Sequence, residues 1–248
     1  MSAAISKHLQ EMLQNKKSWE TKAVLRQVYR RFYEEIRAEL AALPGPTVEL
    51  GSGIGAIKEF IPEAITTDIF DNPWLDRVED AYRLSFGDGS IANLILFDVF
   101  HHLEFPGRAL AEFRRVLKRG GRLVLMEPGF GLAGRIVYHL FHHEPVGFGK
   151  PIRWTLAGEH EPVPASYYAA QGNAWRIFVK GEFREELGGW QVSRVRKISA
   201  LSYVASGGFS RPSLFPDRCL PVMERIDAIG SRFPALCATR MLVSLTKE

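Results

Sequence analysis

Val48-Glu49-Leu50-Gly51-Ser52-Gly53-Ile54-Gly55 joins a short apolar run to a turn rich in glycine. Residues 47–50, of which Val48 and Leu50 are apolar, predict a buried strand. Gly51 and Gly53 allow a tight turn with no side chain above it. A ligand can therefore approach this backbone closely, and we expect a helix over residues 54–60 to point its N-terminus at that ligand. The glycines also fit a dinucleotide-binding pattern, so the turn alone does not identify the cofactor.

The residues after this turn alternate between short apolar runs and amphipathic segments. The spacing predicts further strands at 64–69, 92–99, 122–128, 190–204 and 239–247. It predicts helices at 21–43, 108–119, 131–143 and 216–230, with Gly120-Gly121 capping the second of these. Strands that alternate with helices pair in parallel through right-handed crossovers. The predicted fold class is therefore α/β, with a doubly wound, mostly parallel, Rossmann-like sheet and an inserted cap.

The composition is that of a globular protein and excludes several other classes. Of the 248 residues, 46% are hydrophobic and 24% are charged. The net charge of +4 fits an anionic ligand, but the absence of a dense basic run argues against a dedicated nucleic-acid binder. Cys219 and Cys237 form no CxxC pair, which argues against a disulfide framework or a thiolate zinc site. With no signal peptide and no apolar run long enough to span a bilayer, we expect a cytoplasmic protein.

Asp68 lies 19 residues after Glu49, at the end of the second predicted strand. A carboxylate there can accept hydrogen bonds from both hydroxyls of an adenosine ribose, in a nicotinamide site or in an adenosylmethionine site. The first 70 residues thus indicate an adenosyl cofactor without choosing between these two.

Three later segments narrow the choice: Asp80-Ala81-Tyr82-Arg83-Leu84-Ser85-Phe86-Gly87-Asp88-Gly89-Ser90, then Asp98-Val99-Phe100-His101-His102-Leu103, then Arg115-Val116-Leu117-Lys118-Arg119-Gly120-Gly121. In this order and spacing, residues 46–128 resemble the class I S-adenosylmethionine-dependent methyltransferases, in particular the group with the ubiquinone-biosynthesis enzymes. The resemblance implies a seven-stranded sheet whose last strand inserts antiparallel between its neighbours. It also implies S-adenosyl-L-methionine as cofactor.

The resemblance assigns cofactor roles residue by residue. The methionine-side turn would be formed by Glu49, Gly51, Ser52 and Gly53. The adenosine would be held by Asp68 on the ribose, Ile69 and Ala81 beside the adenine, and Asp80 on the adenine amino group. Phe97 would line the methionine moiety. Ser85, Ile91-Ala92 and Arg119 depart from the family pattern, but they lie in turns or at strand edges.

Histidines are the main candidates for catalytic residues. His101 and His102 follow the fourth predicted strand, while His139, His142 and His143 lie in a later segment that continues into Glu144. We expect catalytic groups from His101, His102, His143 and Glu144, with one of them acting as a base toward an oxygen acceptor. A metal held by His139, His142 and His143, or a helix end that merely favours histidines, is an alternative. The prediction includes no metal.

The predicted organisation is an N-terminal helical segment, residues 1–45, that packs on the domain or covers the cofactor as a lid. Residues 46–248 would form the methyltransferase domain, with 129–181 and 206–236 as insertions that shape the acceptor site. Arg176, Arg184 and Arg211 are candidates for binding an anionic acceptor.

The predicted function is methylation of a small molecule, with oxygen the favoured acceptor atom and a sugar or cell-envelope precursor as an example. The sequence leaves an RNA or protein methyltransferase open as an alternative. An NAD(P)-dependent reductase lacks its Tyr-x-x-x-Lys pair, and a non-catalytic cofactor-binding module is disfavoured by intact Glu49, Asp68 and Asp80. Oligomeric state stays undetermined.

Overall fold

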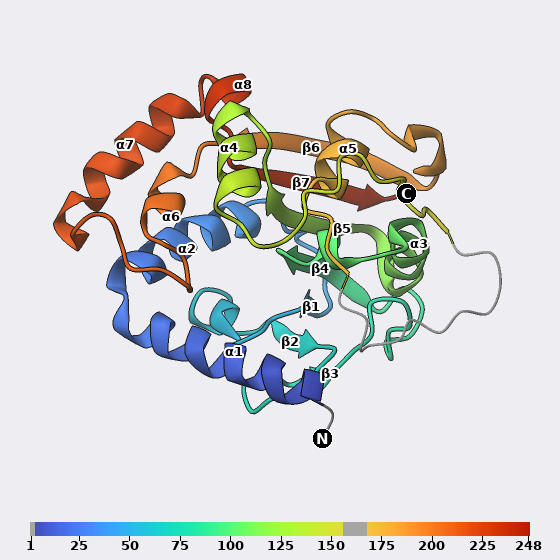
Figure 1. Ribbon diagram of the computed structural model, residues 1–248. Helices are drawn as coiled ribbons and strands as arrows, with labels where there is room; N and C mark the ends of the chain where they lie inside the picture. The colour runs from blue at the N-terminus through green and yellow to red at the C-terminus, as the bar shows by residue number, and fades with distance from the viewer. Residues whose placement is uncertain (1–2, 156–167) are drawn as a thin grey trace.

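A seven-stranded sheet forms the centre of the computed structural model, which describes residues 3–155 and 168–248 (Figure 1). The strand order is β3-β2-β1-β4-β5-β7-β6. The strands β1 to β5 are parallel, and β7 lies antiparallel between β5 and β6. The predicted sheet and the predicted insertion of the last strand are therefore both confirmed.

The strands are β1 Thr47–Leu50, β2 Ile65–Asp68, β3 Arg77–Val78, β4 Ile91–Phe97, β5 Leu117–Pro128, β6 Trp190–Ile198 and β7 Arg240–Lys247. The α-helices are α1 Ala3–Thr21, α2 Ala23–Arg37, α3 Pro106–Val116, α4 Leu132–Leu140, α5 Asn173–Phe178, α6 Leu201–Ala205, α7 Leu220–Gly230 and α8 Pro234–Cys237. Short 3-10 helices are η1 Ala56–Glu59, η2 Phe100–His102, η3 Arg184–Glu186 and η4 Asp217–Cys219.

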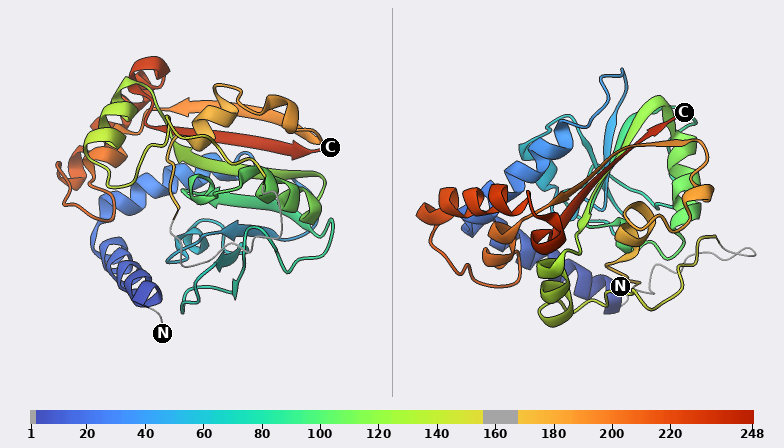
Figure 2. Two further views of the ribbon diagram at one scale, coloured as in Figure 1. Left: turned by 45° about the vertical axis from the view of Figure 1, so that its right-hand side comes forward. Right: turned by 90° about the horizontal axis from the view of Figure 1, so that it is seen from above.

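The hydrophobic core has two layers because the apolar side chains of the central strands alternate between the sheet faces. Leu94 and Leu96 of β4 pack toward α3 and α5, while Ile95 and Phe97 pack toward α2. Figure 2 shows α2 and α3 on opposite faces of the sheet. This packing holds β4 rigidly, so the residues that follow it emerge at a fixed place at the carboxyl edge of the sheet.

Several predicted boundaries were wrong. The helix predicted at 21–43 ends at Arg37, and the strand predicted at 122–128 begins at Leu117. The predicted helix at 54–60 is only the 3-10 turn η1. The predicted helix at 108–119 ends at Val116, and Gly120-Gly121 lie inside β5 instead of capping the helix. A Cβ at Gly121 would lie 2.8 Å from the carbonyl oxygen of Ala92, so this glycine permits close strand pairing.

Two further errors concern the later segments. The predicted strand at 190–204 stops at Ile198, because Asp227 of α7 accepts a hydrogen bond from the backbone N–H of Leu201 at 2.6 Å and so starts α6. The predicted helix at 131–143 ends at Leu140. His142 and His143 therefore lie beyond the helix, in the segment that leads to Glu144.

Candidate active site

The glycine turn after β1 lies against the segment after β4. Gly51 and Gly53 have φ values of 69° and 53°, in the left-handed region that favours glycine. A Cβ at Gly51 would come within 2.3 Å of Cγ2 of Val99. The turn predicted to hold the cofactor is thus in direct contact with the chain that continues into His101 and His102.

Glu49 places a buried carboxylate beneath this turn. Tyr33 of α2 donates its hydroxyl to Oε1 at 3.0 Å, and Oε2 has no hydrogen-bond partner among the described residues. Burial raises the pKa of Glu49 to about 7. A buried carboxylate with an unsatisfied oxygen suits a cationic ligand group, and the α-ammonium of S-adenosylmethionine is such a group.

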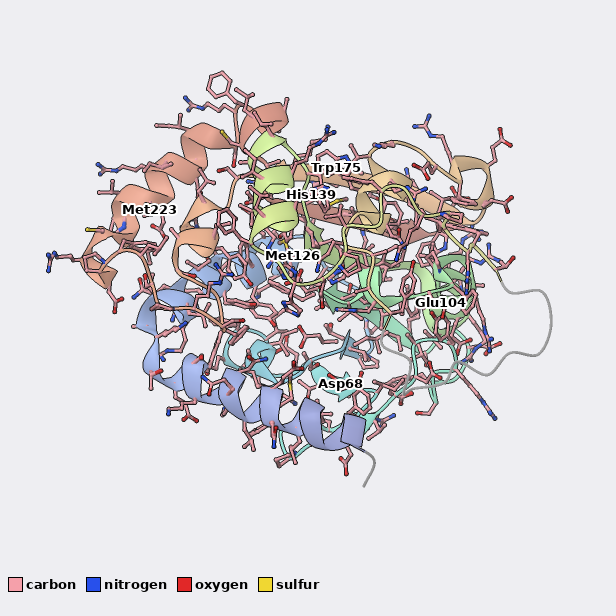
Figure 3. The ribbon with its side chains drawn as sticks, in the orientation of Figure 1. Asp68, Glu104, Met126, His139, Trp175 and Met223 are labelled. Carbon is pink, nitrogen blue, oxygen red and sulfur yellow. The ribbon has the colours of Figure 1, made fainter. Side chains whose placement is uncertain are left out.

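Asp68 and Ser52 tie the turn to β2. Asp68 accepts the backbone N–H of Gly53 at 3.1 Å and that of Phe70 at 3.3 Å. Ser52 donates its backbone N–H to the Thr67 carbonyl at 2.8 Å. Figure 3 shows Asp68 between the sheet and α1. These contacts hold the Asp68 carboxylate at the end of β2, where a ribose could reach it.

The remaining predicted cofactor residues lie along the same edge of the sheet. Phe97 differs from the others because it also packs against α2. Ile69 is 39% exposed beyond β2, and Asp80 and Ala81 are half-buried beyond β3, with Asp80 accepting the Tyr82 N–H at 2.8 Å. Phe97 is buried, and its ring stacks on Tyr29 of α2 with centroids 5.1 Å apart. Phe97 therefore also anchors α2 to the sheet.

His101, His102 and Glu144 form a compact cluster at the end of β4. Nε2 of His101 lies 3.6 Å from Oε2 of Glu144, and Nε2 of His102 lies 3.8 Å from Oε1 of Glu144. Three of the four predicted catalytic residues are thus brought together, and they come from segments about 40 residues apart in the chain. Within the described residues, this group also has the spacing of metal ligands.

The two rings of the cluster are held in different ways. Nδ1 of His101 lies 2.7 Å from Oε2 of Glu127, and because a carboxylate only accepts, Nδ1 carries the hydrogen. Nδ1 of His102 lies 2.9 Å from the carbonyl oxygen of Tyr168, so it also donates. In a neutral His102 ring, Nε2 is then the basic nitrogen, and it faces Glu144.

The charge state of the two histidines also differs. Burial opposes the charged form of His101, but Glu127 and Glu144 outweigh that effect and raise its pKa to about 10. Burial and the positive charge of His101 lower the pKa of His102 below its ordinary value. At neutral pH the cluster therefore holds a charged His101 beside a neutral His102.

His139, His142 and His143 lie in different surroundings, because only His139 belongs to α4. His142 approaches Glu144, with Nδ1 3.9 Å from Oε2. His143, a predicted catalytic residue, is exposed and stacks on His142 at 5.0 Å between ring centroids. His139 is exposed on α4 and contacts the Arg135 carbonyl at 2.9 Å (Figure 3). The alternative metal set of His139, His142 and His143 is therefore not among the possible ligand groups that the described residues form.

Sequence reasoning missed two side chains that support the cluster. Glu127 is fully buried and accepts the backbone N–H groups of Val99 and Phe100 at 3.0 and 2.7 Å, besides facing His101. Gln171 donates its side-chain amide to Glu144. Glu127 could have been found, because it stands near the carboxyl end of the strand predicted beside 92–99. Gln171 carried no such signal.

A comparison with protein families identifies a domain that includes the glycine turn. Residues 49–125 match the family of methyltransferase domains. The chain therefore contains a methyltransferase domain and has the fold of the class I S-adenosylmethionine-dependent methyltransferases. It is therefore an enzyme, and its cofactor is S-adenosyl-L-methionine. No curated protein matches the chain.

Solved structures share the fold of this methyltransferase at low identity. A Thermotoga maritima methyltransferase has a TM-score of 0.54 and 13% identity, covering 96% of this chain and 98% of its own. An Archaeoglobus fulgidus methyltransferase has a TM-score of 0.53 and 13% identity, covering 90% and 94%. A Haloferax volcanii methyltransferase complex with the activator Trm112 has a TM-score of 0.53 and 16% identity, covering 95% and 93%.

No helix in the described part of this methyltransferase is long and apolar enough to cross a membrane.

Proposed function

We propose that this methyltransferase methylates an oxygen atom of a small molecule bound at the cluster of His101, His102 and Glu144. The observation that carries the proposal is the contact between Gly51 and Val99, because it sets the cofactor turn beside the chain that holds this cluster. A methyl acceptor placed against His102 would thus lie close to the methionine end of the cofactor.

The cofactor would be held by the residues that the sequence assigns to it. Glu49 suits the α-ammonium group because its carboxylate is buried with one oxygen unsatisfied. Asp68 suits the ribose hydroxyls, and Ile69 suits the adenine because its side chain is exposed at the strand end. When bound, S-adenosylmethionine supplies a methyl group already activated on a sulfonium. The chain itself must then position the acceptor and remove its proton.

His102 is the base in this proposal. Its lowered pKa keeps the ring neutral at neutral pH, and its Nδ1 hydrogen bond to the Tyr168 carbonyl leaves proton acceptance to Nε2. Glu144 lies beside that nitrogen and would stabilise the imidazolium formed when the acceptor hydroxyl loses its proton. His101 and Glu127 are positioning residues, because they fix the cluster from its buried side.

A hydroxyl acceptor explains why a base is present at all. An alcohol has a high pKa, so its oxygen gains nucleophilicity from a base in the transition state. A sugar hydroxyl in a precursor of a larger glycan has this chemistry. An anionic group on the acceptor finds less support, because Arg176 pairs with Glu182 at 2.6 Å and Arg211 donates to the Phe141 carbonyl at 3.2 Å.

The N-terminal segment would close the site. A Cβ at Gly53 would lie 3.3 Å from Sδ of Met12, so α1 crosses the glycine turn. Trp19 at the end of α1 donates its indole N–H to Glu59 at 2.6 Å. We assign α1 the role of a lid that shields the cofactor from water. We also assign the enzyme to the cytoplasm, where Cys219 and Cys237 would stay reduced.

The test is a methyl-transfer screen with isotopically labelled S-adenosylmethionine. The enzyme is incubated separately with the small-molecule, RNA and protein fractions of a cell extract. We expect label in a small molecule, in a methyl ether bond that mild base does not cleave. Label in RNA or protein, or on nitrogen or carbon, would contradict the proposed acceptor while leaving the methyltransferase activity intact.

A further inference from the structure

Most of the large hydrophobic side chains exposed in the described residues lie in two segments of the chain. Leu140 is 71% exposed, Phe141 58% and Leu214 82%. We define the α4–α7 face as the exposed residues Leu132, Ile136, Leu140, Phe141, Leu214, Val222, Ile226, Ile229, Phe233 and Leu236. Such a concentration on a monomer surface marks a binding surface rather than random exposure.

The elements that carry this face pack on one another. A Cβ at Gly131, just before α4, would lie 2.5 Å from the carbonyl oxygen of Pro234 in α8. At the other end of α4, Arg211 donates to the carbonyl of Phe141, which brings residues 206–216 against the helix end. Figure 1 shows α4, α7 and α8 gathered at one end of the molecule. The apolar residues therefore belong to one region of the surface.

The exposed apolar residues follow helical spacing. In α4, Leu132, Ile136 and Leu140 recur every four residues, while Gly134 and Tyr138 face the interior. In α7, Val222, Ile226 and Ile229 recur at four and three residues. Each helix thus buries one side against the protein and presents a second apolar stripe outward. The fold itself does not use this second stripe.

Arginines accompany the apolar stripes. Arg135 of α4 and Arg225 of α7 are exposed, as are Arg218 and Arg232 at either end of α7. The acidic residues of α7 do not balance them, because Asp227 is buried and Glu224 lies 3.7 Å from Arg31 of α2. Asp217 is exposed. The surface is therefore both apolar and positively charged.

We propose that the α4–α7 face docks on an anionic lipid surface. Amphipathic helices with large apolar residues and arginines lie in the headgroup region, where the apolar side chains enter the acyl boundary and the arginines meet lipid phosphates. A second copy of the chain is a poorer occupant. A two-fold interface would bring the positive charges of this face against one another.

Docking in this way has a consequence for the active site. Phe141 is followed directly by His142, His143 and Glu144, so the chain passes from the docking face into the histidine cluster. The cluster would lie near the lipid surface, within reach of an acceptor anchored there. The docking itself does not depend on the proposed acceptor, so it can be tested without substrate or cofactor.

The experiment measures co-sedimentation of the full chain with vesicles. One set of vesicles contains equal parts of phosphatidylglycerol and phosphatidylcholine, and the other contains phosphatidylcholine alone. We expect binding to the first set that weakens as salt is raised, and at least about tenfold weaker binding to the second.

Two double variants locate the contact: Leu140→Ser with Phe141→Ser, and Ile226→Ser with Ile229→Ser. Each should weaken vesicle binding by about tenfold or more, because each removes two side chains that would enter the acyl boundary. The matched control is Val192→Ser with Leu43→Ser, which changes two exposed apolar residues outside the face. The control should bind as the wild type does. Circular dichroism establishes that each variant is folded.

Three results would overturn the proposal. One is wild-type protein that does not bind the anionic vesicles. Another is binding that the two face variants and the control retain equally. The third is a stable dimer in light scattering, without vesicle binding, that the face variants convert to monomer, because the face would then join two copies of the chain.

Discussion

The Nδ1 atom of His101 lies 2.7 Å from Oε2 of Glu127, and both side chains are buried. Glu127 also accepts the backbone N–H groups of Val99 and Phe100, so one carboxylate fixes both the ring of His101 and the chain leading to it. This carboxylate belongs to β5, and the ring follows β4. The pair therefore connects the edge of the sheet to the histidine cluster and fixes the position of the cluster.

The first prediction concerns stability at high pH. The pKa of His101 is raised from 6.5 to about 10 in the folded protein. A raised histidine pKa contributes stability that is fully present below about 6.5 and is lost as pH rises through about 10. Urea unfolding at a series of pH values should show this loss in the wild type.

Glu127→Gln is the matching variant for this pair. It should lower the free energy of unfolding at pH 6 by about 3–5 kcal/mol, because it leaves a buried charge without its partner. It should also flatten the dependence on pH between about 6.5 and 10. The exposed His139→Gln is the control. A Glu127→Gln protein with wild-type stability at pH 6 would show that His101 is not charged.

The second prediction concerns Glu49 and the cofactor. Burial raises the pKa of Glu49 to about 7, while binding of an ammonium group requires the carboxylate form. Calorimetry should therefore show S-adenosylmethionine affinity falling as pH decreases below 7, by up to about tenfold per pH unit. Glu49→Gln should bind more weakly and lose this pH dependence, whereas the exposed Glu63→Gln should not. A pH-independent wild-type dissociation constant would remove Glu49 from the proposed contact.

The third prediction concerns Asp68. Asp68→Ala removes the proposed acceptor for the ribose hydroxyls and should cost about 1.5–3 kcal/mol of cofactor affinity. Asp71→Ala, an exposed neighbour, should leave affinity unchanged. NAD should not bind to the wild type. Since Asp68 also accepts the Gly53 N–H, thermal unfolding of the variant must be measured alongside. Unchanged affinity in a folded Asp68→Ala protein would contradict the assignment.

The fourth prediction separates base chemistry from metal chemistry at the cluster. Because the pKa of His101 is raised to about 10, an ion could bind its Nε2 at neutral pH only by displacing a proton. Pretreatment with a chelator should therefore leave turnover unchanged, and elemental analysis should find no stoichiometric ion. Loss of turnover that one added divalent ion restores would make His101, His102 and Glu144 metal ligands instead.

The sequence pattern predicted six of the seven strands, because the central ones are apolar runs bounded by glycine or proline. The seventh, β3, has only two residues and was not predicted. β1 was predicted at its observed bounds, and β7 within one residue. The errors arose where distant contacts decide local structure. α6 starts where it does because Asp227 reaches it from α7, and Gly121 lies inside a strand because of its contact with Ala92. Neither contact leaves a local signal in the chain.

The histidine cluster was predicted only in part, again because distant contacts decide which side chains reach it. His101 and His102 follow a strand end, which the sequence marks clearly. Whether His142, His143 or both would reach them depended on where α4 ends, and the helix stops at Leu140. Glu144 was predicted, while the supporting amide of Gln171 comes from a segment with no periodic pattern. The sequence thus predicts the residues that follow the strand end. Tertiary packing determines which other side chains join the cluster.

The most direct test of the account is the pH profile of methyl transfer by the wild type and by His102→Ala. If His102 is the base, wild-type turnover should fall at acid pH through a pKa below 6.5, since the ring must be neutral to accept a proton. His102→Ala should lose about 10²–10⁴-fold in kcat and lose this acid limb, with cofactor affinity intact. His139→Ala should retain the wild-type profile. A His102→Ala enzyme with near-normal kcat and an unchanged acid limb would contradict the central claim.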